Sequence, residues 1–245
     1  MEQENVGLYL GMDISEKYTM ISIYQQHMKE PQTISTIMGS ESYQIPTALA
    51  KKKGVGQWFF GREAKVRVKS GEALGVEDLL DKARTGEEVF LEHEKYAASD
   101  LLAIFLKRVL SLAGSAQAMM PLAKLVICLD KVSVEYMELF SAIMVKLGIE
   151  TDKLLLIDRR ESFYYYALSQ EPETFLHDVV MFDYTESDMV SCRLRRNMHT
   201  TPQVINLDQK NHGKLLDQKD GEFQKIAQDV VDGQVVSETV LTETG

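Results

Sequence analysis

The sequence predicts an α/β fold in which one order of strands and helices is begun twice. Three observations support this prediction. A predicted strand hairpin over residues 8–24 ends its first strand in Asp13, and a second hairpin over residues 179–195 has Asp183 at the same position. Between the hairpins, residues 122–169 alternate strand, helix, strand and helix patterns, which is typical of parallel strands covered by helices. The 245 residues therefore contain one lobe and the start of another.

The first hairpin is predicted from its alternation of side chains. Apolar residues occupy every second position of residues 8–12, and the alternation returns in residues 20–24. A period of two is typical of strands with at least one buried face. Asp13 lies where the first strand enters the turn, so its carboxylate could hold a metal ion or a ligand. An aspartate that only caps the turn is the alternative. Residues 33–38 supply a third short strand.

The region from residue 40 to 97 is predicted as a small insertion with weak patterning, including a short helix at 79–83. Its Gly56-x4-Gly61 spacing superficially resembles a phosphate loop. However, Arg62-Glu63 stands where such a loop requires Lys-Ser/Thr, and no strand-to-helix context is evident. We therefore expect a hairpin turn at these glycines rather than a nucleotide cradle.

The clearest periodicity lies between residues 99 and 169. Ser99 is a suitable N-cap, and apolar residues recur at helical spacing up to Ala113, before Gly114 ends the pattern. The apolar run 122–129 predicts a strand that is buried on both faces. The following predicted elements are a helix at 134–147 closed by Gly148, a strand at 153–158 and a helix at 161–169.

A second start is predicted at Asp178. Residues 179–183 resemble a strand that ends in Asp183, and residues 189–195 a return strand. The further predicted elements are a third strand at 200–207, a helix at 223–231 and a strand at 235–241. The order of elements of the first lobe is thereby begun again. This is a weak internal repeat, visible in element order rather than in residue identity.

The composition excludes several classes of function. No stretch approaches the roughly 18 consecutive apolar residues of a membrane-spanning helix, and the N-terminus lacks the basic-then-apolar layout of a signal peptide. The net charge of −10 argues against a general nucleic-acid binder, which needs a basic surface. Cys128 and Cys192 form no metal or disulfide pattern. We expect a cytoplasmic protein with no nucleic-acid or membrane partner.

Two lobes of this order, each opening with an Asp-tipped hairpin, resemble the actin and heat-shock chaperone superfamily, whose two ribonuclease-H-like lobes close over ATP. Gly11-Met12-Asp13 falls at the first phosphate motif of that superfamily and Phe182-Asp183 at the second. The resemblance covers nearly the whole chain and is greatest to a bacterial group of chaperone-like proteins.

The resemblance also implies how the chain is divided. It predicts a first ribonuclease-H-like lobe over residues 1–177, with the small insertion at about 40–97, and the start of a second lobe over 178–245. Residues 239–242 resemble the strand that enters the adenosine motif. We therefore expect a fragment whose last subdomain lies beyond Gly245.

Both phosphate loops lack the glycines of the superfamily. The first loop, Asp-x-Gly-Thr/Ser in the superfamily, reads Asp13-Ile14-Ser15-Glu16, and the second, Asp-x-Gly-Gly-Gly-Thr, reads 183-DYTESD-188. Glycine lets backbone N–H groups approach phosphates without a Cβ in the way. Glu16 and Glu186 also add negative charge where phosphates would sit. Each such contact near 4 Å opposes binding by on the order of several kcal/mol at an effective dielectric of 20.

The groups that would drive hydrolysis are also replaced. In the superfamily motif Asn-Glu-Pro-Thr, the glutamate orders the attacking water. The aligned residues are Asp158-Arg159-Arg160-Glu161, so Arg159 takes the place of that glutamate. For the catalytic lysine of the chaperones the only candidate is Lys82. Because phosphoryl transfer depends on positioning and charge stabilisation by these groups, we do not expect hydrolysis.

The leading hypothesis is therefore a degenerate, non-hydrolysing scaffold or regulatory module for protein partners. A corollary is that Arg159 or Arg160 pairs with Glu16 or Glu186 and fills the former phosphate site. Such a buried arrangement needs every charge partnered.

The alternative hypothesis is an ATP-binding switch with weak ATPase activity, in which Asp13 and Asp183 hold Mg²⁺ through water. The residues that would contact the nucleotide are Asp13, Ser15, Lys17, Lys82, Asp183, Thr185 and Ser187. A small-molecule kinase of the superfamily would need a catalytic aspartate after a glycine-rich second loop, and the sequence offers no good candidate. Filament formation depends on surface contacts and stays open.

Overall fold

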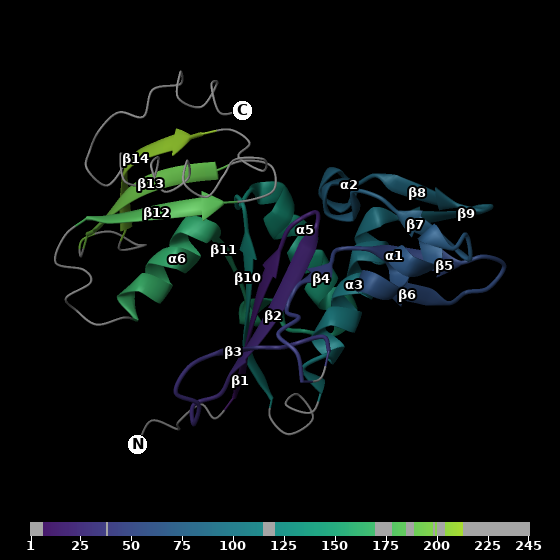
Figure 1. The fold of residues 1–245 in the computed structure, drawn as a ribbon, viewed down its shortest axis with the longest axis horizontal. Coiled ribbons are helices and arrows are strands. Elements are labelled where there is room, and N and C mark those ends of the chain that lie inside the picture. Colours follow the sequence, from purple (N-terminus) through teal and green to yellow (C-terminus); the bar gives the residue numbers. More distant parts are fainter. Residues whose placement is uncertain are drawn as a thin grey trace. The chain divides into compact units, whose positions relative to one another are not determined.

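The computed structural model describes residues 7–37, 39–114, 121–169, 178–184, 189–197, 199 and 204–212 (Figure 1). The chain forms two compact units, Met1–Asp158 and Arg159–Gly245. The described residues form a mixed α/β structure, as predicted. The units divide at 158/159, whereas the sequence analysis placed the lobe boundary at 177/178.

A mixed sheet forms the centre of the first unit. Its strands lie in the order β11-β10-β1-β2-β3, and β4 also pairs with β2. The β1–β2 pair is antiparallel, which confirms the predicted hairpin, while β10 runs parallel to both β1 and β11. The bounds are β1 Leu8–Ile14, β2 Tyr18–Tyr24, β3 Gln32–Thr33, β4 Ile45–Pro46, β10 Leu122–Leu129 and β11 Leu154–Asp158.

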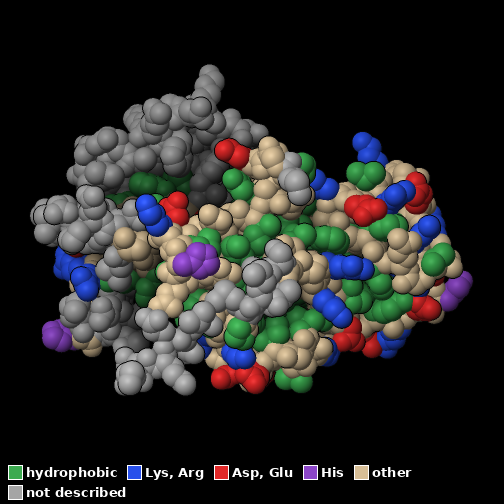
Figure 2. Space-filling view, turned by 90° about the horizontal axis from the view of Figure 1, so that it is seen from below, with side chains coloured by type: hydrophobic (Ala, Val, Ile, Leu, Met, Phe, Trp, Pro, Cys, Tyr) green, Lys and Arg blue, Asp and Glu red, His purple; other side chains and the backbone are tan. Residues whose placement is uncertain are grey.

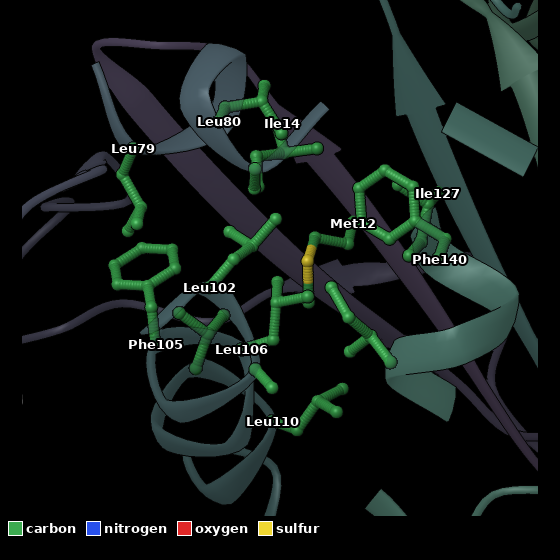
Figure 3. Close-up of a cluster of buried hydrophobic side chains, with 14 of the residues drawn as sticks. Met12, Ile14, Leu79, Leu80, Leu102, Phe105, Leu106, Leu110, Ile127 and Phe140 are labelled. Atoms are coloured by element: carbon green, nitrogen blue, oxygen red, sulfur yellow. The ribbon is translucent and has the colours of Figure 1, made fainter. Parts of the chain in front are cut away.

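The core of the first unit lies on one face of this sheet. The period of two in β1 buries Leu8, Leu10, Met12 and Ile14, each at most 2% exposed. Two helices cover this face, α3 (Ala98–Ser111) and α5 (Val134–Leu147). Figure 3 shows side chains of α3 gathered around Met12, with Phe140 of α5 beside it.

Both helices follow the predicted patterns. The apolar stripe of α3 is buried, but the N-cap is Ala97 rather than the predicted Ser99, which lies within the first turn, and no described side chain caps this end of the helix. α5 has the predicted bounds, and Gly148 closes it in the left-handed conformation (φ 71°), as glycine allows without a Cβ clash. The Oγ of Ser133 caps its first turn by accepting from the N–H of Tyr136 at 3.5 Å.

The insertion contains more regular structure than its patterning predicted. A three-stranded sheet of order β6-β5-β7 carries α1, and a separate β8–β9 hairpin follows α2. The bounds are β5 Leu49–Lys52, β6 Trp58–Phe60, α1 Gly61–Lys69, β7 Ala73–Val76, α2 Leu79–Thr85, β8 Glu88–Leu91 and β9 Glu94–Ala97, with a 3₁₀ turn at Thr151–Lys153 later in the unit.

The prediction of a hairpin turn at both glycines of 56–61 was wrong at its second glycine. Gly56 does lie in the β5–β6 connection, but Gly61 follows β6 directly and begins α1 with φ +61°. A strand-to-helix junction is therefore present. The sequence did not predict this helix, because most of its residues are charged or exposed and only Gly61 and Ala64 are buried.

A buried lysine ties the β8–β9 hairpin to β5. Lys51 is 5% exposed, and its ammonium forms ion pairs with Glu94 and, at 3.8 Å, with Glu92. The Tyr96 ring centroid lies 5.4 Å from the same nitrogen. The bond to Glu94 raises the pKa of Lys51 far above its usual value, so the side chain stays charged in this position.

The second unit contains a helix and a three-stranded antiparallel sheet of order β12-β13-β14. Phe163 of α6 packs against Met181, Cys192 and Leu194 of the sheet. The predicted helix at 223–231 and strand at 235–241 lie outside the described residues. The bounds are α6 Arg159–Leu168, β12 Val179–Tyr184, β13 Met189–Arg196 and β14 Val204–Asn211.

Two predicted strands have different bounds in the structure. The third strand of the first unit spans only Gln32–Thr33, because Thr36 turns away from the sheet and donates its N–H to the carbonyl of Ser42 at 2.8 Å. The third strand of the second unit is described over Val204–Asn211 and extends past the predicted end at residue 207, while the predicted residues 200–203 lie outside the described residues. In the described part of the chain, no helix has both the length and the apolar character required to cross a membrane.

Candidate functional site

Asp13 lies at the carboxyl end of β1, on the sheet face opposite the core. Because β1 buries Met12 and Ile14, the side chain between them points the other way and is half-buried. Its register partners are Cys128 on β10 and Met20 on β2. The carboxyl ends of parallel strands are the usual place for ligands in α/β sheets. The predicted position of Asp13 at the turn is confirmed.

The hydroxyl of Ser15 is used by the turn itself. It donates to the carbonyl of Tyr18 at 3.0 Å and accepts from the N–H of Tyr18 at 3.2 Å. The backbone carbonyl of the next-but-one residue, Lys17, accepts from the N–H of Thr47 at 2.9 Å and ties the turn to β4. The turn is thus closed by its own polar groups, as in other serine-stabilised turns.

Glu16 interacts with the first turn of α2. Desolvation raises the pKa of Glu16 above its usual value, and the backbone N–H groups of Asp81 and Leu80 partly offset that effect. Asp78, the residue at the N-cap, has φ 50° and its side chain caps nothing within the described residues. The carboxylate of Glu16, which is distant in sequence, thus lies near the N-terminal amides of α2.

Lys82 does not extend from α2 toward an acidic site residue. Its ammonium donates to the backbone carbonyl of Glu77 at 2.8 Å, and the residue is half-buried. The candidate for the catalytic lysine is therefore bonded within its own segment.

Two further side chains near Glu16 were not predicted. The guanidinium carbon of Arg84 lies 5.9 Å from the ring centroid of Tyr136 on α5, and Arg84 also pairs with Asp81. Burial raises the pKa of the Tyr136 phenol, Arg84 opposes this, and the charge of Glu16 adds to it. A sequence pattern could not show this cluster, because it joins the β1–β2 turn, α2 and α5.

In the second unit, Asp183 pairs with an arginine at the start of α6. The Nη1 of Arg159 donates to Oδ1 of Asp183 at 3.4 Å, and the two side chains are 19% and 26% exposed. The corollary named Glu16 or Glu186 as the partner of Arg159 or Arg160, whereas the described partner of Arg159 is Asp183, the aspartate predicted to hold Mg²⁺. Glu186, Thr185 and Ser187 lie outside the described residues.

The neighbouring Arg160 bonds to an amide. Its Nη1 donates to Oε1 of Gln209 on β14 at 2.7 Å, and Nδ2 of Asn206 donates to the same oxygen at 3.1 Å. In the structure Arg160 thus donates to an uncharged amide on β14, a partner that the corollary did not name.

A buried polar pair, also missed by the sequence analysis, lies elsewhere in this unit. The Oγ of Ser191 lies 2.7 Å from Nε2 of His212, and both residues are at most 4% exposed. Burial lowers the pKa of the His212 imidazole, with a further contribution from Lys210. Both side chains are buried, so this serine and histidine form a structural contact.

The metal-binding capacity of the described residues is limited. Asp13 belongs to the first unit and Asp183 to the second. Among the residues that the structure describes, no three His, Cys, Asp or Glu side chains lie together in a group that could hold a metal ion. In the second unit, Arg159 competes for Asp183 with any cation.

Comparison with known proteins gives a family but no function. No curated protein matches the chain. The family model described as "Family of unknown function (DUF5716) C-terminal" matches residues 30–245, which is most of the chain. The chain therefore belongs to the DUF5716 C-terminal family.

Proposed function

We propose that this chain is a degenerate member of the actin and heat-shock chaperone superfamily that acts as a non-hydrolysing scaffold or regulatory module for protein partners. The order of elements supports the proposal. Three antiparallel strands, β1 to β3, are followed along the chain by α3, β10, α5, β11 and α6, and the antiparallel strands β12 to β14 begin the order again. A ribonuclease-H-like lobe is the proposed fold of each half.

The observation that carries the proposal is the ion pair between Arg159 and Asp183. A carboxylate that anchors a magnesium ion, directly or through water, must present its negative charge to the cation. Here a guanidinium lies 3.4 Å from that carboxylate. The pair is largely shielded from water, so its charges attract more strongly than exposed ones would. A cation would have to displace the arginine.

The turn after Asp13 offers further support. An anion bound there would meet the negative charge of Glu16, whose carboxylate lies near the backbone N–H groups of Asp81 and Leu80. The Ser15 hydroxyl, the expected substitute for a glycine amide, is bonded to Tyr18. The Ser15 hydroxyl, which would have to bind phosphate, is thus already used within the turn.

Calorimetric titration of Mg-ATP and Mg-ADP into the full-length protein tests the loss of nucleotide function. We expect no binding heat and no phosphate release above an enzyme-free blank. Binding tighter than about 100 μM, which corresponds to roughly 5.5 kcal/mol, would contradict the proposal if it were lost in the Asp13→Ala, Asp183→Ala double variant. In that case the ATP-binding switch would be the better description.

The scaffold role requires a second experiment. Proteins captured by the wild type in cells are cross-linked and identified, and the capture is repeated with the double variant and with added Mg-ATP. We expect one unchanged set of partners in all three samples, because binding does not pass through the nucleotide site. A set that changes with ATP in the wild type, and not in the double variant, would contradict the proposal.

A further inference from the structure

A small cavity lies in the first unit, outside the candidate site. Its volume is about 260 Å³. The walls come from the connection between β3 and β4, from the β6–α1 junction and from the end of α3. Their apolar side chains belong to Ile37, Ile45, Pro46, Phe60 and Leu112. Because small-ligand pockets typically start near 300 Å³, this cavity suits one ring or one branched aliphatic group and is too small for a nucleotide.

The rim of the cavity is held in place by hydroxyl groups. The N–H and Oγ1 of Thr36 donate to the carbonyl of Ser42 at 2.8 and 2.9 Å, and Oγ of Ser35 donates to the carbonyl of Ile37 at 2.8 Å. These bonds keep Ile37 at the rim with 47% of its surface exposed. A preformed apolar rim reduces the entropy cost of binding.

One positive charge at this rim has no acidic partner. The Nη2 of Arg62 donates to Oγ of Ser42 at 2.7 Å, and no carboxylate in the described part of the chain pairs with the guanidinium. The adjacent Glu63 also lines the cavity, and its carboxylate lies 3.6 Å from Arg67 in an exposed pair. Arginine binds carboxylates through two parallel N–H donors. The amide of Gln44 lies in the same lining.

The surface around the cavity carries both apolar and charged side chains. On the side of the molecule that carries α1, β5 and β6 in Figure 1, Figure 2 shows hydrophobic side chains reaching the surface among Lys and Arg side chains and also among Asp and Glu side chains. The exposed apolar residues of α1 include Val66 and Val68. A preference of the cavity for a negatively charged ligand therefore depends on Arg62 itself and not on the surrounding surface.

We propose that this cavity binds a small apolar carboxylate, with the apolar group against Ile45, Phe60 and Leu112 and the carboxylate on Arg62. Such a carboxylate occurs in free aryl or alkyl acids and in the C-terminal residue of a peptide. The site does not depend on nucleotide binding, so it stands or falls independently of the scaffold role.

Two probes test the site, 3-phenylpropionate and N-acetyl-phenylalanine, each with its amide as the uncharged control. Amide NMR shifts of the isotope-labelled full chain are followed during titration. We expect Kd values on the order of 1 mM for ligands of this size, with shifts at Ile37, Gln44 and Arg62. The amides should bind about five- to tenfold more weakly. Tighter binding of N-acetyl-phenylalanine would assign the site to peptide C-termini, and tighter binding of 3-phenylpropionate would assign it to free acids.

Variants test whether binding depends on the charge of Arg62 or on any basic residue of α1. Arg62→Gln should weaken both acids about five- to tenfold and Arg62→Lys by less, because the charge remains. Lys69→Gln removes the same charge from the other end of α1 and should change nothing. Equal binding of acid and amide by the wild type, which needs no variant, would overturn the proposal. So would equal affinities of the Arg62→Gln and Lys69→Gln proteins, or shifts confined to residues outside the cavity.

Discussion

The Nη1 of Arg159 lies 3.4 Å from Oδ1 of Asp183, with both side chains mostly withdrawn from water. The arginine is the first residue of α6 and the aspartate lies near the end of β12. The packing of Phe163 on Met181 fixes this helix against the sheet. Arg159, which the resemblance aligned with the water-ordering glutamate, therefore pairs with Asp183, the aspartate that was expected to hold Mg²⁺.

Removing the arginine should destabilise the second unit. Exposed ion pairs contribute about 0.2–1 kcal/mol, whereas breaking a buried pair costs about 3–5 kcal/mol. This pair is intermediate, so Arg159→Ala should lower the free energy of unfolding by about 1–2 kcal/mol in urea titrations. A double-mutant cycle with Asp183→Asn should show coupling of about 1 kcal/mol.

Arg193→Ala provides the matched control for this prediction. Arg193 is 51% exposed, and its Nε is 4.0 Å from Asp178, so its loss should cost at most about 0.5 kcal/mol. Equal destabilisation by the two arginine variants would show that the Arg159 pair contributes no more than a surface contact.

Glu16→Ala should loosen the first turn of α2. The carboxylate lies near two backbone N–H groups there, which lower its pKa, and the residue is exposed, so the cost belongs at the low end of capping effects, about 0.5–1 kcal/mol. Glu16→Gln keeps an acceptor oxygen and should cost less.

Native-state hydrogen exchange locates this effect, with the amides of Leu80 and Asp81 exchanging faster in Glu16→Ala while those of α3 stay unchanged. Glu30→Ala, an exposed glutamate in the β2–β3 connection, is the control. Unchanged protection of Leu80 in Glu16→Ala would refute the capping role.

The second unit should lose stability as the pH falls below about 6.5. Burial lowers the pKa of His212 below its ordinary value of 6.5, so the unfolded chain takes up a proton on this residue at a higher pH than the folded unit does. Where the unfolded state binds more protons, stability rises with pH. The contribution is therefore complete above pH 6.5 and is lost progressively as the pH falls through that value toward the folded pKa.

Unfolding followed between pH 7 and pH 5 measures this slope, which should disappear in His212→Gln and persist in His199→Gln, because His199 is exposed. Ser191→Ala removes the partner 2.7 Å from Nε2 and should cost about 1–2 kcal/mol at pH 7. A pH slope of equal size in His212→Gln would contradict the assignment.

The sequence predicted those elements whose signal is local. β10 and α5 have the expected bounds because a mostly apolar run, broken only by Lys124, and a capped 3.6-residue pattern specify them without reference to the rest of the chain. The β8–β9 hairpin was missed because its strands are short and mostly exposed. A strand with little buried surface shows no clear alternation.

The contacts of the candidate site needed the structure for a different reason. Asp13 and Asp183 could be recognised because each ends a strand. The contacts of Glu16 and Arg159 could not be predicted in this way. Glu16 lies beside the first turn of α2 and Arg159 begins α6, so both contacts depend on how a helix terminus packs in three dimensions. Asp78 illustrates the difficulty: an aspartate before a helix predicts an N-cap, yet its φ of 50° leaves that role to Glu16.

Gly61→Ala should destabilise the first unit by more than its small change in volume indicates. Gly61 has φ +61°, a conformation that costs a residue with a Cβ about 1–2 kcal/mol. A Cβ there would also lie 3.1 Å from Cγ2 of Ile45, which is 2% exposed and has little room to move. We expect a loss of about 2 kcal/mol, measured by urea unfolding.

Gly56→Ala is the control for the strain at Gly61. Gly56 lacks a positive φ, and a Cβ built on it meets no described atom within 4 Å. This substitution should be neutral or stabilise by up to about 1 kcal/mol, because alanine restricts the unfolded chain. A Gly61→Ala protein as stable as Gly56→Ala would mean that the β6–α1 junction relaxes freely. In that case Ile45 and Phe60 would not form the fixed wall that the proposed carboxylate site requires.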